Sequence, residues 1–365
     1  MLQLKFSAQT SDLVYALSVV GRALTGKAVR PIMEGILIRA KDNVVTMTAT
    51  NGSITLRSSI PAVVDEEGET VLPGRLLSDL ARKLPGHEVT VTLDGTRAVI
   101  RSGASRTGLS VMAANEFPEP PEIVAKHTLT VKQGTMKTAI AGTAYCVSTD
   151  ETRLILTGVY LDAAQDVRMV ALDGFRLACV EVNATHDGDF SAIIPGKSMS
   201  ELARLMAYDD QTCEIRFDDH LMVASNGSDT LYTTLLNGSY PDYKRIIPSG
   251  FKTSVLVNRS DLLAAIDRAS IIGKSGSLVR LTVQDTSVTV ASRDEIGQIE
   301  DTVGAMMSGQ EMVIALNARY MTDALKAMTD EDVTLNFNSP TTPCVVLPKE
   351  GHSALNLVLP VRVAK

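Results

Sequence analysis

Two lysines of this chain stand in a sequence context that is typical of phosphate binding. Gly196-Lys197-Ser198 and Gly273-Lys274-Ser275 each match the end of a P-loop, in which a glycine-rich turn cradles phosphate oxygens and the lysine neutralises their charge. The full motif also needs a glycine five residues before its second glycine, and those positions hold Ser191 and Arg268. Both matches therefore fail, and we interpret the two segments as helix starts or ends.

Other catalytic or metal-binding arrangements are not apparent in the sequence. No Gly-x-Ser-x-Gly nucleophile elbow occurs, and the acidic run Asp65–Glu69 contains Gly68 between two strand patterns, which favours a solvated loop. The histidines show no metal-ligand spacing; they are His87, His127, His186, His220 and His352. We therefore predict no catalytic residues, no metal, no cofactor and no enzymatic activity of the chain itself.

The cysteines and the terminal segment predict a cytoplasmic protein. None of the cysteines forms a Cys-x-x-Cys pair, and such scattered thiols suit a reducing compartment. Met1–Thr10 has no long apolar run, and no stretch approaches the roughly 20 apolar residues that a membrane span needs. We expect no association with a membrane.

A charged triplet recurs three times at a constant spacing. Leu72–Pro85, Ile194–Ala207 and Ala315–Met328 each carry a base, an acid four residues later and a second base three residues after the acid. Successive copies are 122 residues apart. At about 100° per residue these positions share one stripe of a helix, opposite the apolar residues. The triplets are Arg75/Asp79/Arg82, Lys197/Glu201/Arg204 and Arg319/Asp323/Lys326.

Strand patterns repeat with a compatible period, which predicts three related domains. One set alternates apolar and polar residues up to a turn, as hairpins do: Val44–Leu56, Val167–Leu177 and Val288–Glu300. A second set reads as strand, turn, strand: Val89–Ser102, Thr212–Ser225 and Val333–Leu347. Pro118–Ile123 and Pro248–Thr253 separate the units. We predict an α+β fold of three repeated domains, residues 1–120, 121–250 and 251–365, whose sheets can join edge to edge into a closed array.

Positive charge is concentrated on the predicted helices, although the chain is acidic. The six helices are expected at Ser7–Leu24, Pro73–Pro85, Val131–Ser148, Pro195–Tyr208, Asn258–Lys274 and Leu316–Thr329. Together they carry a net charge of +7, which leaves −14 on the rest of a chain whose total is −7. A base and an acid on an exposed helix can be a solvated face without function. Three triplets in register favour one shared surface, and a mildly basic surface attracts duplex DNA without reading its bases.

Several motifs across the whole chain resemble those of the bacterial β sliding clamp family, the processivity subunits of DNA polymerase III. The motifs are Arg30-Pro31-Ile32, Leu72-Pro73-Gly74-Arg75, Arg101-Ser102-Gly103, Phe117-Pro118, Asp173-Gly174-Phe175-Arg176-Leu177, Tyr240-Pro241-Asp242-Tyr243 and Leu359-Pro360-Val361-Arg362. The resemblance implies three similar domains per subunit and a head-to-tail homodimer that closes a ring around duplex DNA. Helices are then expected to line the hole, with antiparallel sheets outside.

The resemblance also implies a pocket for partner peptides between the second and third domains. The matching positions are Leu156, Leu172, Gly174, Phe175, Arg176, Leu177, Pro241, Arg245, Ile246, Leu357, Leu359, Pro360, Val361 and Arg362. An apolar cleft with arginines at its rim suits a short peptide with hydrophobic anchors. Without the resemblance, core and terminal-strand residues would be the simpler interpretation. Many relatives have threonine and histidine where this chain has Leu172 and Phe175, so we expect a more apolar pocket.

Contacts with DNA and between subunits follow from the triplets, the basic helices and the resemblance. The expected DNA-binding residues are Lys27, Arg75, Arg82, Lys132, Lys137, Arg153, Lys197, Arg204, Arg319 and Lys326. Relatives often have aromatic residues where this chain has Leu154 and Ile155, which leaves Arg153 as the expected contact in that loop. At the seam, Arg106 and Leu109 are expected to meet Ile271 and Ile272 of the other subunit, with Glu300 pairing with the basic side.

Two other classes of function are compatible with parts of the pattern. A duplicated enzyme with a cleft between its domains would need converging polar groups, which the sequence does not offer. A scaffold that binds only proteins would have no need of basic stripes in register. The clamp interpretation implies the replicative polymerase, the clamp loader and other proteins with clamp-binding motifs as partners. Polymerase activity then belongs to the holoenzyme, and an ATP-driven loader must open the ring, since this chain has no nucleotide motif.

Overall fold

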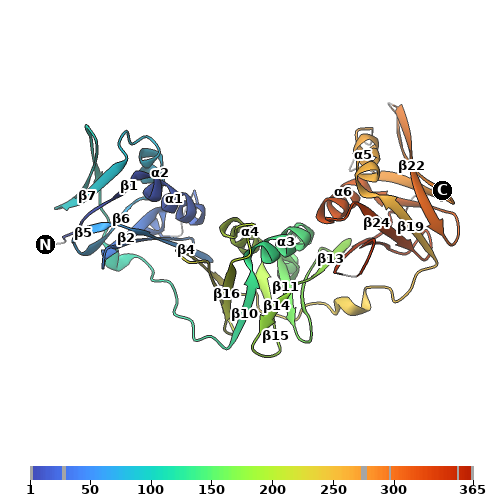
Figure 1. Cartoon of the computed structure of the whole chain (residues 1–365), viewed down its shortest axis with the longest axis horizontal. Coiled ribbons are helices and arrows are strands. Elements are labelled where there is room, and N and C mark those ends of the chain that lie inside the picture. Colours follow the sequence, from blue (N-terminus) through green and yellow to red (C-terminus); the bar gives the residue numbers. More distant parts are fainter. Residues whose placement is uncertain (1–2, 27–29, 273–277, 296, 352, 363–365) are drawn as a thin grey trace. The chain divides into compact units, whose positions relative to one another are not determined.

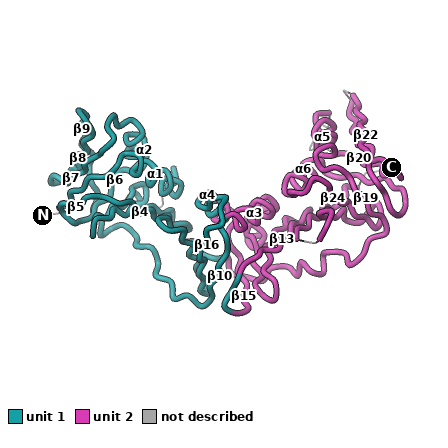
Figure 2. The backbone as a smooth tube through the Cα atoms, viewed as in Figure 1, with its two compact units in different colours: residues 1–133, 185–187, 201–235 teal, residues 134–184, 188–200, 236–365 magenta. Residues whose placement is uncertain are grey.

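The computed structural model describes residues 3–26, 30–272, 278–295, 297–351 and 353–362. Lys27 and Gly273-Lys274-Ser275 therefore lie outside the described residues. Contacts divide the chain into two compact units, shown in Figure 2. Unit 1 comprises residues 1–133, 185–187 and 201–235, and unit 2 comprises residues 134–184, 188–200 and 236–365. The three predicted domain boundaries stay a prediction.

All six predicted helices are present, with shorter bounds than the sequence suggested. They are α1 (Thr10–Val20), α2 (Gly74–Ala81), α3 (Gln133–Thr143), α4 (Gly196–Leu205), α5 (Arg259–Ser270) and α6 (Ala318–Ala327). Short 3-10 turns extend α1 and α3, namely η1 (Gly21–Ala23) and η4 (Ala144–Cys146). Asn258 and Asn317 begin α5 and α6 because their side chains accept backbone N–H groups of the first turn. None of the helices among the described residues is long and apolar enough to cross a membrane.

Every predicted helix start falls on the end of the preceding strand, and two of them illustrate the correction. Ser7 belongs to a strand, β1 (Lys5–Gln9), and α1 begins only at Thr10. Lys132 is the last residue of strand β10 (His127–Lys132), and α3 begins at Gln133. In both cases alternating residues pair with a neighbouring strand up to the helix start, and this pairing overrides the helical pattern.

Unit 1 contains two antiparallel sheets among its described residues. The five-stranded sheet has the order β5 (Val63–Glu66), β1, β7 (Glu88–Asp94), β8 (Arg97–Ser102) and β9 (Ser105–Ser110). The nine-stranded sheet has the order β14 (Ala184–His186), β10, β16 (Thr212–Phe217), β17 (Leu221–Ser225), β18 (Asp229–Thr234), β4 (Ile54–Pro61), β3 (Val44–Thr50), β2 (Gly35–Lys41) and β6 (Gly68–Pro73). The predicted hairpins are therefore confirmed as β3–β4, β7–β8 and β16–β17.

Unit 2 is built on one twelve-stranded sheet. Its order is β15 (Phe190–Pro195), β11 (Gly158–Ala163), β12 (Val167–Leu172), β13 (Arg176–Glu181), β26 (Ala354–Val358), β25 (Cys344–Pro348), β24 (Asp332–Phe337), β19 (Thr253–Asn258), β22 (Gly297–Ser308), β21 (Ser287–Asp294), β20 (Leu278–Gln284) and β23 (Met312–Asn317). The remaining predicted hairpins are confirmed as β12–β13, β21–β22 and β24–β25.

Helices pack in pairs against these sheets and bury their apolar faces. In unit 1, α1 lies beside α2 and against β3 and β4 (Figure 1). In unit 2, α5 lies beside α6 and against β21 and β22. Leu262, Ile266 and Met321 are fully buried in the core that α5 and α6 share. Burial of one helix face leaves the bases of the triplets in solvent, as the pattern predicted.

The first two repeats are joined inside unit 1 by a strand pair and two polar contacts, which we call the first joint. Strand β4 pairs with β18, so that Leu56 lies opposite Leu231. Buried Asp229 accepts hydrogen bonds of 2.6 Å from Tyr15 on α1 and from Ser58 on β4. The bond to Asp229 is the main cause that raises the pKa of Tyr15 to about 12. Strand pairing and these hydrogen bonds cover sheet edges that would otherwise be open.

The second and third repeats are joined in the same way inside unit 2, which we call the second joint. Strand β13 pairs with β26, so that Ala178 lies opposite Asn356. Tyr145, in η4, donates a hydrogen bond to the side chain of Asn356. Asn356 is buried, so this bond satisfies a polar group inside the joint.

Candidate functional site

The turn between β12 and β13 shapes one wall of the predicted peptide pocket. Gly174 has a φ of +95°, which an L side chain rarely adopts. Asp173 stabilises the turn because its Oδ1 accepts the backbone N–H groups of Phe175, at 2.8 Å, and Arg176, at 3.1 Å. The Asp-Gly-x-Arg-Leu motif is thus a tight hairpin turn that points Phe175 outward and Arg176 inward.

Arg176 is held by contacts with three elements. Its guanidinium donates to Asp173 at 3.0 Å, to Asp323 of α6 at 2.6 Å and to the carbonyl of Tyr145 at 2.9 Å. The ring of Tyr320 lies 4.5 Å from it. Burial opposes the charged form, but the carboxylates of Asp323 and Asp173 outweigh burial, and the pKa of Arg176 is raised. Only 10% of the Arg176 side chain is exposed to solvent. Its contacts therefore stabilise the second joint.

An apolar cluster lies beside this turn and contains five of the predicted pocket residues. These are Leu156, Leu172, Leu177, Leu357 and Leu359. The sequence prediction missed three tyrosines of the same cluster, Tyr160, Tyr240 and Tyr243. The rings of Tyr160 and Tyr240 are stacked with centroids 4.8 Å apart, and the hydroxyl of Tyr243 donates to Asp162 at 2.8 Å. The Tyr-Pro-Asp-Tyr motif was the available signal, because it supplies two of these rings.

Three predicted pocket residues expose apolar surface around the cluster. Phe175 is 57% exposed, Ile246 41% and Val361 42%. The C-terminal segment is fixed here because the N–H of Leu359 donates to the carbonyl of Phe175 at 2.9 Å, and the N–H of Val361 to that of Ala315 at 2.8 Å. The exposed set also includes Gly174, Pro241, Arg245 and Arg362, while Pro360 is half-buried. Exposed apolar side chains beside an apolar cluster form a surface that suits hydrophobic anchors.

Arg153, which the sequence analysis grouped with the DNA contacts, lies next to the hairpin turn. It belongs to η5 (Glu151–Thr157) and forms an ion pair with Asp150 at 3.1 Å. A Cβ atom on Gly174 would lie 2.9 Å from its Nη1. Its guanidinium therefore covers the turn at the edge of the apolar cluster. Leu154 and Ile155 follow the non-helical backbone of Arg153 within η5, and Leu154 is exposed.

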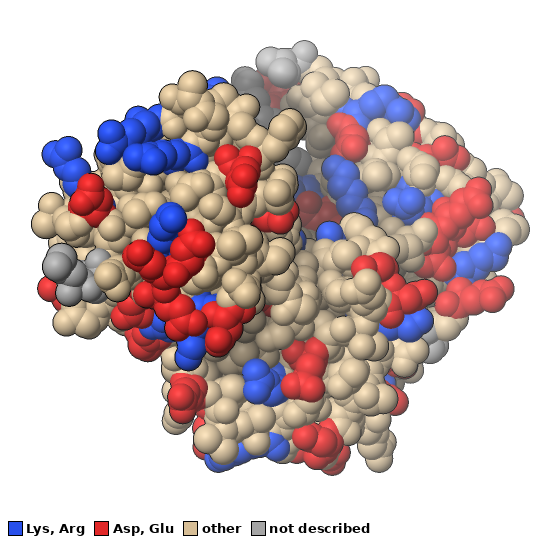
Figure 3. Space-filling model, turned by 60° about the vertical axis from the view of Figure 1, so that its left-hand side comes forward, with Lys and Arg blue, Asp and Glu red and all other residues tan. Residues whose placement is uncertain are grey.

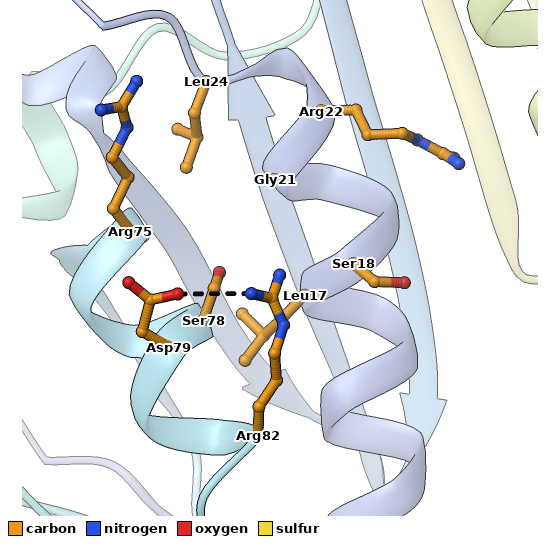
Figure 4. Close-up of a pocket in the computed structure, with 9 residues that line it drawn as sticks. All are labelled: Leu17, Ser18, Gly21, Arg22, Leu24, Arg75, Ser78, Asp79 and Arg82. Atoms are coloured by element: carbon orange, nitrogen blue, oxygen red, sulfur yellow. Dashed lines mark hydrogen bonds and ion pairs between the residues drawn. The ribbon is translucent and has the colours of Figure 1, made fainter.

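The first basic triplet borders a cavity of about 310 Å³ between α1 and α2. Figure 4 shows Arg75, Asp79 and Arg82 along α2, with Arg22 on the turn that follows α1. Arg75 and Arg82 are exposed, and Arg82 pairs with Asp79 at 3.3 Å. Positive groups thus gather around a hollow that opens to solvent.

The bases of the other two triplets are exposed, but their acids form ion pairs with arginines of other elements. Lys197, Arg204, Arg319 and Lys326 are all exposed. Glu201 pairs with Arg204 and also with Arg22, whereas Asp323 pairs with Arg176. The acids of the second and third triplets thus belong to the joints and do not only balance the charge of a helix surface.

The two lysines predicted around α3 occupy different environments. Lys132, on β10, pairs with Asp210 at 2.9 Å, which offsets part of its charge. Lys137 lies on α3 and is half-buried. In Figure 3 a group rich in Lys and Arg lies at the upper left, with a group rich in Asp and Glu below it. Charge is therefore segregated locally although the total is negative.

The predicted seam residues lie on two open strand edges and one helix end. Arg106 is exposed on β9 and Glu300 is exposed on β22. Ile271, which follows α5, is 78% exposed, and Ile272 is half-buried. Leu109 is only 5% exposed, so it packs into its own sheet and offers little surface to a partner.

Metal and thiol chemistry have no support in the part of the chain that the structure describes. No group of three or more His, Cys, Asp or Glu side chains is placed to hold a metal ion there. All four cysteines are free thiols. Burial raises the pKa of Cys146 to about 12 and the pKa values of Cys179 and Cys213 to about 11. A thiol that stays protonated at neutral pH is a poor nucleophile.

Replacing Arg176 by lysine tests whether the second joint depends on a planar cation. Lysine keeps the charge but cannot reach Asp173, Asp323 and the Tyr145 carbonyl together, so Arg176→Lys is expected to lower the free energy of unfolding by about 1–3 kcal/mol. Arg245→Lys is the matched control because Arg245 is 87% exposed and pairs with Asp242 at 2.9 Å. Urea denaturation of both variants measures the difference, and equal stabilities would contradict this role of Arg176.

Comparisons with known proteins assign the family. Models of the N-terminal, central and C-terminal domains of the DNA polymerase III beta subunit match residues 4–121, 130–242 and 244–362. The chain is 32% identical to the beta sliding clamp of Staphylococcus epidermidis, over 98% of this chain and 99% of that protein. The crystal structure of the DNA polymerase sliding clamp from Bacillus subtilis matches with a TM-score of 0.96 at 30% identity, covering 99% of this chain and all of that one. A sliding clamp from Bartonella birtlesii bound to griselimycin matches with a TM-score of 0.94 at 27% identity, with coverage of 99% and 100%. The chain therefore belongs to the bacterial β sliding clamp family, the beta subunits of DNA polymerase III.

Proposed function

We propose that this protein is a DNA sliding clamp that closes into a ring of two copies around duplex DNA and tethers the replicative polymerase. The observation that carries the proposal is the match to sliding clamps over the whole chain, in sequence and in fold. Clamps are processivity subunits, so polymerase activity belongs to the holoenzyme and not to this chain. The proposal places the protein with the chromosome in the bacterial cytoplasm.

Contacts with DNA in this proposal are weak and independent of sequence. Exposed arginines and lysines of the triplets attract phosphates, as do Lys27, Lys132, Lys137 and Arg153 in the set predicted above. Phosphate contacts position a protein on DNA without reading bases, and each can be exchanged for the next as the protein moves. A closed ring needs no high affinity, because release requires the ring to open or the DNA to end.

Retention on circular and linear DNA tests the topological part of the proposal. The protein, loaded by its clamp loader onto nicked circular duplex at moderate salt, is expected to stay bound during gel filtration. Linearising the same DNA after loading is expected to release it within minutes, since the ring runs off the ends. Equal loss from both forms, or equally salt-sensitive retention on both, would show that binding is not topological.

The interface between copies can be derived from the two joints within the chain. β9 ends the five-stranded sheet, and residues Gly297–Gly304 of β22 pair with β21 on one edge only, among the described residues. β9 corresponds to β18 and β26, and this part of β22 corresponds to β4 and β13. Counting residue pairs across the equivalent sheets of the three repeats shows which residues hold the same position. Thr107 of β9 holds the position of Leu231 in β18 and of Asn356 in β26. Ile299 of β22 holds the position of Leu56 in β4 and of Ala178 in β13.

The same register between two copies places opposite charges face to face. In both joints the counterparts of Thr107 and Ile299 lie directly opposite each other. Thr107 of one copy therefore pairs with Ile299 of the other, and Arg106 with Glu300. Opposite charges on facing residues of an antiparallel pair stabilise it by roughly 0.2–1 kcal/mol. Such a head-to-tail interface closes after two copies if the rotation allows it.

Charge exchange at the seam tests this register. Arg106→Glu and Glu300→Arg each place like charges opposite each other, so each variant is expected to weaken the dimer about tenfold in sedimentation equilibrium. The variant with both changes restores opposite charges and is expected to return to within about twofold of the unchanged protein. A double variant that is weaker than either single one would rule out the register.

We also propose that the apolar cluster beside the β12–β13 turn binds the clamp-binding peptides of the polymerase, the clamp loader and other partners. The support is its exposed apolar rim, with Phe175, Ile246 and Val361, next to a cluster rich in leucine and tyrosine. A short peptide can place two or three hydrophobic anchors there and exclude water from them. Leu172 and Phe175 make this wall apolar, which favours peptides with few polar anchors.

Substituting one exposed apolar residue tests the peptide site without disturbing the core. Ile246→Glu places a charge beside the cluster, so it is expected to weaken binding of a clamp-binding peptide at least about tenfold in fluorescence anisotropy. Val124→Glu is the control, because Val124 is 83% exposed and belongs to unit 1, whereas the cluster belongs to unit 2. Equal affinities of the two variants would place the peptide elsewhere.

A further inference from the structure

The chain contains three Asn-Gly pairs, and such pairs can change covalently without an enzyme. They are Asn51-Gly52, Asn226-Gly227 and Asn237-Gly238, each followed by serine. Glycine has no side chain, so its backbone nitrogen is open to approach by the side-chain amide carbon of the preceding asparagine. Whether the two atoms can meet depends on the contacts that hold each pair in the fold.

Asn51 is fixed in the turn between β3 and β4. Its Oδ1 accepts the N–H groups of Ser53 at 3.0 Å and of Ile54 at 2.9 Å. The N–H of Gly52 donates to Oγ1 of buried Thr50 at 3.1 Å. Hydrogen bonds thus hold both the amide of Asn51 and the nitrogen of Gly52, so the turn has to open before the two can react.

Asn226 is fixed in the turn between β17 and β18. Its Nδ2 donates to the carbonyl of Leu205, and its backbone N–H donates to the carbonyl of Asp229 at 3.1 Å. The residue is half-buried, and these two bonds tie its side chain and its main chain to different elements of unit 1. This pair is therefore also protected while unit 1 is folded.

Asn237 has no such protection. It is exposed and lies between β18 and η6 (Tyr243–Arg245), in a segment without helix or strand. Its side chain forms no hydrogen bond with any residue that the structure describes. Gly238 is exposed as well, with a φ of +149° that other residues rarely adopt. The side-chain amide of Asn237 is therefore free to rotate toward the Gly238 nitrogen.

We propose that Asn237 deamidates spontaneously in the folded protein and is thereby a covalent modification site in the segment that leads into the apolar cluster. The Gly238 nitrogen, after loss of its proton to hydroxide, attacks Cγ of Asn237. The new N–Cγ bond closes a succinimide ring, and the Cγ–Nδ2 bond breaks as ammonia leaves with a proton from water. Water then opens the ring. Attack at Cγ gives aspartate, whereas attack at the main-chain carbonyl carbon of residue 237 gives isoaspartate.

Isoaspartate changes the main chain where the fold has little room. It adds one main-chain atom before Gly238, and a Cβ atom on that glycine would already lie 2.5 Å from Cδ1 of Ile155. The segment is anchored on both sides of the change. The N–H of Leu236 donates to a carbonyl of β15 at 2.8 Å, and the Tyr240 ring is stacked within the apolar cluster. The added atom therefore displaces either Ile155 or Tyr240.

Mass spectrometry of the full-length protein tests the site. At mildly alkaline pH, Asn237 is expected to convert from amide to carboxylate at least about tenfold faster than Asn51 or Asn226. Fragment ions must separate Asn226 from Asn237, because no lysine or arginine divides them. In concentrated urea the three rates are expected to converge, because the protecting contacts are lost. Equal rates in the folded protein, or a slow Asn237, would overturn the proposal.

Asn237→Gln is the matched control for the chemistry. Glutamine keeps the amide but has to form a larger ring, which closes far more slowly. The variant is therefore expected to show no conversion at this position over the same time, with unchanged rates at Asn51 and Asn226. Conversion of the variant at the rate of the unchanged protein would rule out attack by the Gly238 nitrogen.

The effect on peptide binding rests on the proposed function and is measured separately. Ion-exchange chromatography isolates the deamidated protein, in which enzymatic methylation measures the isoaspartyl fraction. In fluorescence anisotropy the isoaspartyl form is expected to bind a clamp-binding peptide at least about threefold more weakly than the unchanged protein. Asn237→Asp adds the charge without the main-chain atom and should stay within about twofold.

The outcomes separate the modification from the proposed function. Equal affinities of the isoaspartyl form and Asn237→Asp would overturn the effect on the cluster and leave the modification standing. A protein that binds the peptide in none of these forms would overturn the proposed peptide site, whereas the rate of deamidation at Asn237 decides the modification by itself.

Discussion

Antiparallel strand pairing between repeats is the interaction on which this structure depends. Each repeat alone would present open sheet edges, and unpaired backbone groups on an edge invite any strand to pair with them. β4 with β18 and β13 with β26 close these edges inside the chain, with the same register in both cases. Among the described residues, β9 and residues Gly297–Gly304 of β22 are open edges at the repeat positions that pair in the two joints, and in the proposed ring a second copy supplies the matching strand. Assembly is thus an extension of the fold.

Because strand pairing joins the repeats, the exposed faces of the helices are available to contact another partner. α1 and α2 bury one face on strands and present Arg75 and Arg82 to solvent. An acidic chain can hold DNA under these conditions because the field near a surface depends on local charge and not on the total. Weak, exchangeable phosphate contacts permit sliding, whereas base readout would stop it. The absence of tryptophan and the low aromatic content fit this role, since no base is stacked.

The periodic features of the fold could be predicted from the sequence, and the contacts between repeats could not. Helix periodicity and the 122-residue spacing located all six helices, and alternation located the hairpins. Asp323 was interpreted as part of a charged helix stripe, yet it holds Arg176, which is 147 positions away in sequence. The position of Arg153 beside the turn at Gly174 was not predicted either, and its contact with DNA stays a prediction. Local patterns report which face is buried, but they do not report which distant residue arrives there.

The joints within the chain and the joint between copies differ in the links that must be broken to separate them. The joints within the chain are also linked covalently, which raises the effective concentration of their surfaces and makes them costly to separate. They also contain the half-buried ion pairs of Arg22 with Glu201 and of Arg176 with Asp323, whose separation would leave charged groups without partners. The joint between copies has no covalent link. In the proposed ring, separation is therefore expected between copies, where no covalent link holds the two surfaces together.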